Sequence, residues 1–223
     1  MIVRAVVFDF NGILADDDPI HMRAFRQVAQ EEGLSFSEED YLNEYLPLND
    51  RDCFQHLWKS NNRTLRDGEL DELIRRKGVY YYRAIDQQPV LFKGADEAIR
   101  AAARRGPVGI ASGARGEEIR HILGAAGLLD CFVTVVAAED VVHGKPHPEP
   151  FQLAHARLKA HSSQLRPQDC LAVEDSIGGI QSARDAGLPC LGVAHSYTRD
   201  KLEGKAQWVI DSISDFGDWL NRL

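Results

Sequence analysis

A short apolar run near the N-terminus, Val3 to Phe8, limits the possible folds more than any other segment. It is rich in β-branched residues and ends on Asp9, a pattern typical of a strand buried on both faces in a parallel sheet. In open parallel sheets the reactive crevice lies beyond the carboxyl ends of the strands, so Asp9 is predicted to lie where such a fold carries its chemistry. Asn11 should point to the same side, and Gly12 permits a tight turn or the close approach of a ligand.

From residue 89 to the C-terminus, helical and strand-like patterns alternate. Strands that alternate with helices of about ten residues are typical of crossover units. The chain is therefore predicted to be an α/β protein with a doubly wound parallel sheet of Rossmann-like organisation. The expected helices are 95–105, 116–125, 149–161 and 177–186, and the expected strands are 108–111, 132–136, 170–173, 190–193 and 208–210.

Residues 17–88 interrupt this alternation directly after the first strand and contain no convincing strand pattern. An all-helical interval in this position is interpreted as an insertion over the reactive edge of the sheet. We therefore expect two domains, a catalytic core of residues 1–16 and 89–223 and a helical cap of residues 17–88. Within the cap, the expected helical pieces are 19–33, 38–46, 52–59 and 67–86, with a break from Pro47 to Asp50.

The composition restricts the possible partners. The 223 residues are 44% hydrophobic and carry a formal net charge of −8, and no basic block offsets that charge. This argues against binding to nucleic acid or to an anionic membrane surface. No apolar stretch approaches the ~18 residues that a membrane span needs. The chain also enters its first strand without a recognisable targeting segment.

The four cysteines are widely spaced and include no CxxC pair and no cysteine–histidine cluster. They indicate neither a zinc site nor a disulfide framework. A reducing, cytoplasmic location is the simplest expectation. The sequence leaves the oligomeric state open.

Polar residues at four predicted strand ends would converge on one crevice. They would bring together carboxylates, a hydroxyl beside a glycine and an ammonium group. Because a carboxylate nucleophile and a phosphate ester repel each other, the site needs cations, which Mg²⁺ and a lysine would supply. The set favours phosphoryl transfer by attack of Asp9 on phosphorus, although each motif alone also fits a turn, a helix cap or a solvated loop. The groups are Asp9 with Asn11, Ser112 with Gly113, Lys145, and Glu174 with Asp175.

This ordered set resembles the four motifs of the haloacid dehalogenase-like hydrolase superfamily, and the resemblance covers essentially the whole chain. The insertion, with Asp16 and Pro19-Ile20-His21, is similar to that of the helical-cap subgroup that contains β-phosphoglucomutase and sugar-phosphate phosphatases. The matching segments are Asp9-Phe10-Asn11-Gly12, Ser112-Gly113, Gly144-Lys145-Pro146 and Val173-Glu174-Asp175-Ser176, followed by Gly178-Gly179-Ile180 and residues 183–187.

The resemblance implies a role for each site residue. Asp9 would be the nucleophile of a phosphatase that acts on a small phosphorylated metabolite. In the cap, Arg51 and His21 would contact the substrate. The Mg²⁺ ion would be held by the Asp9 carboxylate, the Asn11 backbone carbonyl and Asp175, with Glu174 further out. The phosphoryl group would be held by Ser112, the amides of Gly113 and Ala114, and Lys145.

Asn11 departs from the family pattern, which has a second aspartate that serves as general acid and base. A carboxamide cannot carry a proton near neutral pH, although its backbone carbonyl can still bind a metal. Loss of general acid–base catalysis typically lowers the rate 10²–10⁴-fold, which corresponds to a barrier higher by about 3–5 kcal/mol. Either the activity is attenuated, or the leaving group needs little protonation, or another group takes over the proton. The candidates for that group are Asp16, Asp17, Asp18 and His21.

Several other functions remain as alternatives. A catalytically attenuated relative that binds phosphometabolites is one, and a phosphosugar mutase is a weaker one, because it needs the acid–base group in both half-reactions. A phosphonate hydrolase would need a reactive cap lysine, and nothing around Lys59 or Lys77 marks one. The acidic pair Glu174-Asp175 argues against a metal-free dehalogenase. The absence of GxGxxG after the first strand excludes a Rossmann dehydrogenase.

Overall fold

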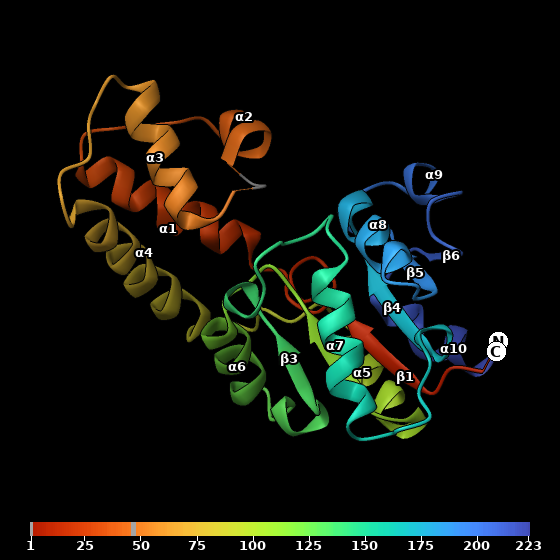
Figure 1. Cartoon of the computed structure of the whole chain (residues 1–223). Helices are drawn as coiled ribbons and strands as arrows, with labels where there is room; N and C mark the ends of the chain where they lie inside the picture. The colour runs from red at the N-terminus through yellow and green to blue at the C-terminus, as the bar shows by residue number, and fades with distance from the viewer. Residues whose placement is uncertain (1, 46–47) are drawn as a thin grey trace. The chain divides into compact units, whose positions relative to one another are not determined.

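The structure of the protein is a computed structural model that describes residues 2–45 and 48–223 (Figure 1). It contains two compact units. Unit 1 comprises Met1–Asp16 and Val90–Leu223, and unit 2 comprises Asp17–Pro89. The end of the helical piece predicted over 38–46 and the break predicted at Pro47 lie outside the described residues. None of the described helices is both long enough and apolar enough to span a membrane.

Unit 1 is built on a six-stranded sheet with the strand order β3-β2-β1-β4-β5-β6. All neighbouring strands are parallel. The four central strands are buried along their whole length, as expected of a parallel sheet covered on both faces. The predicted α/β class with a doubly wound sheet is thus confirmed. The strands are β1 Ala5–Phe8, β2 Val108–Ala111, β3 Thr134–Val136, β4 Cys170–Glu174, β5 Cys190–Val193 and β6 Trp208–Ile210.

The strand order reverses beside β1. Successive strands extend from β1 to β3 on one side, and from β4 to β6 on the other. In open α/β sheets, ligands bind at such a switch point, beyond the carboxyl ends of the strands. Phe8 pairs with Val173 in the register of β1 with β4, and Asp9 then donates its N–H to the Val173 carbonyl over 2.9 Å. Asp9 and Glu174 are therefore neighbours at the switch point.

Helices cover both faces of the sheet (Figure 1). On one face, Phe151 of α7 joins Val7 of β1 in a buried apolar cluster. On the other, Phe216 of α10 packs against Phe8, with ring centroids 5.4 Å apart. Adjacent residues of β1 thus pack against helices on opposite faces of the sheet, because successive side chains of a strand point to opposite faces. The helices of unit 1 are α5 Ala95–Arg105, α6 Gly116–Ala125, α7 Glu149–Lys159, α8 Ile177–Asp185, α9 Arg199–Leu202 and α10 Phe216–Asn221.

Unit 2 is helical, and its described residues contain no strand. Its core is aromatic. The ring of Phe25 lies 4.9 Å from that of Phe36, 5.3 Å from Tyr45 and 4.9 Å from Phe54, measured between centroids. The Phe36 ring is stacked on Phe25, the Tyr45 ring is tilted and the Phe54 ring is edge-on, and such offset and edge-on arrangements add to the stabilisation from apolar burial. The elements are α1 Asp18–Glu31, α2 Glu38–Asp40, a π-helical turn Tyr41–Tyr45, α3 Asp50–Ser60 and α4 Glu69–Ile85.

The segments that precede and follow unit 2 in the chain lie side by side within unit 1. Asp16 donates its N–H to the Val90 carbonyl over 2.7 Å, and Phe92 donates its N–H to the Leu14 carbonyl over 2.9 Å. We call these two paired segments, residues 14–16 and 90–92, the neck. The chain therefore leaves unit 1 and returns to it through two segments that are hydrogen-bonded to each other.

Candidate active site

An ion pair joins the ends of β1 and β4. Lys145 extends from the loop before α7, and its Nζ lies 2.8 Å from Asp9 Oδ1 and 2.5 Å from Glu174 Oε1. The Glu174 side chain is fully buried, and those of Asp9 and Lys145 are 13% and 14% exposed. Lys145 also lies 5.0 Å above the ring of Phe151. Burial alone would lower the pKa of Lys145, but the charges of Asp9 and Glu174 hold it above its ordinary value.

Glu174 is held by donors from its own chain segment. Its Oε2 accepts the backbone N–H groups of Asp175 and Ser176 over 3.1 and 3.2 Å, and the Ser176 hydroxyl over 3.0 Å. Burial nevertheless raises the pKa of Glu174, although the Lys145 ammonium opposes this shift. Glu174 is thus an anchor for Lys145 rather than a freely accessible carboxylate.

Asp175 completes an acidic cluster with Asp9 and Glu174, in which one carboxylate oxygen of each lies within 4.8 Å of the others. Burial, with the negative charges of Asp9 and Glu174, raises the pKa of Asp175 to about 8. With all three carboxylates ionised, the cluster would exceed the Lys145 ammonium by two negative charges, and the raised pKa of Asp175 reflects the cost of that excess. A hard divalent cation with oxygen ligands would offset the excess and suits the donor set, which fits Mg²⁺.

The turn after β1 brings its backbone against Asp175. Gly12 has φ +76°, and a Cβ atom added there would lie 2.0 Å from Asp175 Oδ2. The Phe10 carbonyl accepts the N–H groups of Leu14 and Ala15 over 2.8 and 3.0 Å, which closes the turn. Glycine is therefore required at residue 12 both by the backbone angle and by the close approach. Asn11, the predicted metal and acid–base position, lies in this turn beside Asp9.

Replacing Gly12 with alanine should lower the free energy of unfolding by more than about 2 kcal/mol. The left-handed backbone alone costs an alanine about 1–2 kcal/mol, and displacement of Asp175 adds to that. Mg²⁺ affinity should fall as well. Urea unfolding and metal titration measure the two effects. As a matched control, Gly124→Ala in α6, where a Cβ has nothing within 4 Å, should be stabilising by about 0.5–1 kcal/mol. Equal stability of the two variants would contradict this account.

Ser112 follows β2 at the same edge of the sheet and is buried. Its N–H donates to the Val136 carbonyl over 3.0 Å, and its hydroxyl oxygen accepts the Ala114 N–H over 3.1 Å. Gly113 lies between them and has open space at its Cβ position. The Ala114 amide is engaged by Ser112, so a phosphoryl group would have to share this donor. The predicted phosphate-binding roles of these three residues stay predictions.

His195 and Ser196, which follow β5 and were not predicted as site residues, support the site. The Ser196 hydroxyl donates a hydrogen bond to Asp175 Oδ2. The His195 Nδ1 lies 2.7 Å from the Gly12 carbonyl, and its Nε2 accepts the Ile213 N–H. Because Nε2 is an acceptor, Nδ1 carries the proton and donates it to Gly12. These residues also follow a strand end, and extending that criterion to β5 would have found them.

The other two predicted site residues, His21 and Arg51, belong to unit 2. Arg51 forms an exposed ion pair with Asp71 over 2.8 Å. His21 Nδ1 accepts a hydrogen bond from Lys77 Nζ over 2.7 Å, and its Nε2 lies 3.3 Å from Asp17 Oδ2. Both residues thus have partners inside their own unit, and their contact with a substrate stays a prediction.

A buried polar network ties together α1, α3 and α4 within unit 2. Lys77 of α4, only 4% exposed, pairs with Asp50 of α3 as well as with His21 of α1. Tyr81, one turn after Lys77, donates its hydroxyl to Asp17 Oδ2 over 2.5 Å. Its ring stacks on His21 with centroids 4.2 Å apart. The network joins the buried side chains of Asp17 and Lys77 to that of Asp50, which is 26% exposed.

Replacing Lys77 with methionine should destabilise unit 2 by about 2 kcal/mol, because it leaves Asp50, whose side chain is 26% exposed, and the His21 Nδ1 acceptor without their buried partner. Arg51→Met is the matched control, since the exposed pair of Arg51 with Asp71 is worth at most about 1 kcal/mol. Amide hydrogen exchange in α4 measures the loss in each variant. Similar protection in both variants would show that the Lys77 network contributes no more than a surface ion pair.

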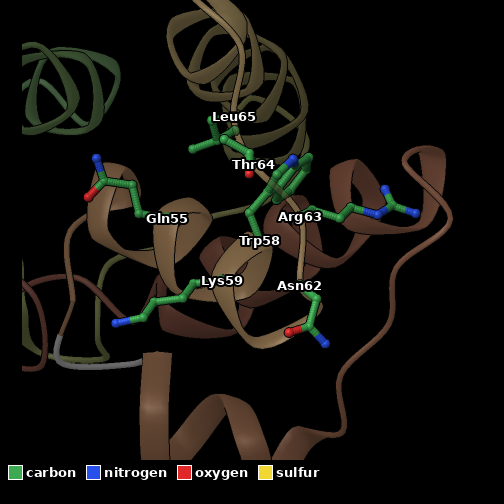
Figure 2. A pocket seen from close by; sticks show the side chains of 7 residues that line it. All are labelled: Gln55, Trp58, Lys59, Asn62, Arg63, Thr64 and Leu65. Atoms are coloured by element: carbon green, nitrogen blue, oxygen red, sulfur yellow. The ribbon is translucent and has the colours of Figure 1, made fainter.

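Two surface hollows lie outside the acidic cluster. One, of about 390 Å³, is in unit 1 and is lined by residues that precede β4, β5 and β6, among them Gln168, Pro189 and Gln207. It therefore lies at the amino ends of the strands, opposite Asp9. The other, of about 420 Å³, is in unit 2, and Figure 2 shows Lys59 and Arg63 extending to opposite sides of it. The lining residues of the second are Gln55, Trp58, Lys59, Asn62, Arg63, Thr64 and Leu65.

The site thus places a carboxylate at the switch point of a doubly wound sheet, beside a lysine and an acidic pair. The pattern of the haloacid dehalogenase-like hydrolases matches residues 3–187. The chain belongs to this family, which confirms the resemblance drawn from the motifs.

The chain is similar to several named members of the family. It is 27% identical over 200 residues to phosphoglycolate phosphatase of Yersinia pseudotuberculosis, covering 87% of this chain and 82% of that protein. It is 29% identical over 223 residues to protein CbbY of Rhodobacter capsulatus, covering 96% and 95%. Among solved structures, CbbY of Rhodobacter sphaeroides in complex with phosphate superposes with a TM-score of 0.83 at 23% identity, covering 97% of each chain. This last likeness confirms the fold.

Proposed function

We propose that the protein is an Mg²⁺-dependent phosphatase that hydrolyses a small phosphorylated metabolite through an aspartyl-phosphate on Asp9. The observation that carries the proposal is the ion pair of Asp9 with Lys145 beside two further carboxylates at the switch point. A nucleophilic carboxylate can approach an anionic phosphate only where cations offset the repulsion. Lys145 supplies one, and the excess negative charge of the cluster favours a second.

The residues of the site have separate roles in this proposal. Asp9, the Asn11 carbonyl and Asp175 would hold Mg²⁺, with Glu174 behind them, and the ion would polarise the phosphoryl oxygens and offset their charge. An Asp9 carboxylate oxygen attacks phosphorus, and the ester P–O bond breaks with its electrons on the leaving oxygen. Lys145 holds the transferred group, and water then attacks phosphorus to release phosphate and restore Asp9.

Asn11 determines how the leaving oxygen gains its proton. Its carboxamide has no acidic proton to give, so an alkoxide leaving group must be protonated by water or by another residue. This favours either slow turnover of simple esters or a substrate whose leaving group is already stable as an anion, such as an acyl phosphate. A silent relative that binds phosphometabolites without turning them over is the second candidate, and Asn11 is the observation that favours it.

Unit 2 is proposed to act as the cap that excludes water and selects the substrate. Its described residues are helical, and it is inserted directly after the turn that follows Asp9. The names of the relatives, phosphoglycolate phosphatase among them, support a small phosphorylated substrate. Cytoplasmic location remains a prediction, with which the four free thiols agree.

The proposal is tested by phosphate release from a panel of phosphate esters and acetyl phosphate, with Mg²⁺ and after its removal by a chelator. We expect turnover of at least one substrate with Mg²⁺, loss of turnover with the chelator, and recovery when Mg²⁺ is restored. Turnover that persists without a divalent ion would overturn the metal assignment. If no substrate is turned over while phosphate ligands still bind, the protein is the silent relative.

A further inference from the structure

A second group of metal-ligand side chains lies on the loop that carries Lys145. His143, His147 and Glu149 each offer a ligand atom, and these atoms lie within 4.8 Å of one another. The Nδ1 of His143 is 3.0 Å from Glu149 Oε2, and the Nδ1 of His147 is 3.9 Å from the same oxygen. The two imidazole rings lie side by side, with centroids 4.7 Å apart. We call these three residues the histidine cluster.

We propose that the histidine cluster is a second metal site, which binds a zinc-class transition-metal ion. Two imidazoles and one carboxylate are a ligand set that suits Zn²⁺, Co²⁺ and Ni²⁺, whereas Mg²⁺ prefers oxygen ligands alone. Ligand atoms around a tetrahedral zinc ion lie about 3.4 Å apart, because each bond is about 2.0–2.1 Å long. The spacings of 3.0 and 3.9 Å lie on either side of that value. His147 Nδ1 also accepts the Glu149 N–H over 3.2 Å, and a bound ion would replace that hydrogen bond.

The carboxylate of the cluster is already ionised and fixed in place. Glu149 Oε1 accepts the Val142 N–H over 2.8 Å, and Oε2 accepts the His143 N–H over 3.0 Å. These backbone donors, the Val142 N–H first, hold the pKa of Glu149 below its ordinary value. Glu149 is the first residue of α7, where the helix dipole disfavours a cation, so its negative charge is needed for binding.

The imidazoles are accessible from water. The side chain of His143 is 63% exposed and that of His147 is 48% exposed. An ion can therefore enter from solvent and keep water in its fourth position, as in zinc sites with three protein ligands. This site was not predicted from the sequence. The prediction there rested on the spacing of cysteines, and the His143-x3-His147-x-Glu149 pattern contains none.

The histidine cluster lies on the same loop as Lys145 but is separate from the carboxylate cluster that Lys145 contacts. Lys145 lies between His143 and His147 in sequence, but its ammonium reaches Asp9 and Glu174 instead. A bound ion would link both ends of the segment that carries Lys145. The loop would thus be restrained by a metal different in kind from the one proposed for the carboxylates.

The test is direct metal binding to the untagged, full-length protein. Mg²⁺ is kept in large excess to occupy the carboxylate cluster, so that the added metal reports on the histidine cluster. Zn²⁺ binding is followed by calorimetry, and Co²⁺ binding by its visible absorption. We expect one equivalent to bind. His143→Gln and His147→Gln should each weaken binding at least about tenfold, since even loss of a residue that only orients a ligand costs 10–100-fold.

Two controls separate this site from others. His161→Gln removes an exposed histidine outside the cluster and should leave Zn²⁺ affinity unchanged. Asp175→Asn alters the carboxylate cluster and should also leave it unchanged, so the outcome does not depend on whether the protein is a phosphatase. The inference is wrong if Zn²⁺ fails to bind, if His147→Gln binds it as tightly as the wild type, or if Asp175→Asn abolishes the binding.

Discussion

Replacing Asp9 with asparagine is expected to lower the turnover of every phosphorylated substrate about 10⁴-fold or more. Asparagine has nearly the same shape, but its carboxamide is not a nucleophile toward phosphorus, and removal of an enzyme nucleophile has losses of this size. Phosphate release at saturating substrate and Mg²⁺ measures the effect. Intact-mass analysis after an acid quench should detect a phosphorylated wild-type chain and no phosphorylated variant.

The fold should survive this change, because Lys145 keeps its pairing with the buried Glu174. Asp185→Asn is the matched control: it makes the same chemical change at an exposed position on α8 of the same unit and should leave turnover unaltered. If Asp9→Asn kept turnover within tenfold of the wild type while remaining folded, the covalent route through Asp9 would have to be abandoned.

Replacing Asn11 with aspartate is expected to raise the turnover of simple phosphate esters about 10²–10⁴-fold. The new carboxyl group would donate a proton to the leaving oxygen and then accept one from the attacking water, and such help has this size in other enzymes. Acetyl phosphate should gain less than about tenfold, because acetate leaves as a stable anion. The comparison of kcat/KM for an ester and for acetyl phosphate thus isolates the missing proton transfer.

Asn221→Asp, the same chemical change on α10 at an exposed position, controls for the added charge and should change neither substrate. A flat response of ester turnover in Asn11→Asp would mean that another group already moves the proton. Asp16, Asp17, Asp18 and His21 would then be the residues to replace next. An equal gain for both substrates would instead point to a general effect on metal binding.

The sheet of unit 1 could be predicted because its buried strands have an unambiguous pattern. The segment 108–111 agrees with β2 residue for residue, and 190–193 agrees with β5. The strand predicted over 132–136 is shorter, since Leu129–Cys131 forms a 3-10 turn and Phe132 donates its N–H to the Leu129 carbonyl. The helix α10 was not predicted, because six residues are too few to establish a helical period.

The candidate site could be predicted only in part. Asp9, Lys145 and Glu174 were found because each follows or approaches a strand end, and parallel strands present those ends at one edge. The strand-end criterion, extended to β5, would have placed His195 and Ser196 at the same edge of the sheet. Their contacts with Gly12 and Asp175 depend in addition on β5 lying beside β4, which is a property of the assembled sheet. The contact of His21 with Lys77 could not be foreseen either, because Lys77 is distant in sequence and its burial depends on the packing of α1 against α4.

The neck described above has an evolutionary consequence. Since the hydrogen bonds of Asp16 to Val90 and of Phe92 to Leu14 fix both ends of the insertion, exchanging the inserted helices for others adds little loop-closure entropy to the folding of unit 1. If the insertion selects the substrate as proposed, new selectivity can arise by changes within it, while the strand ends proposed to carry the chemistry stay unaltered.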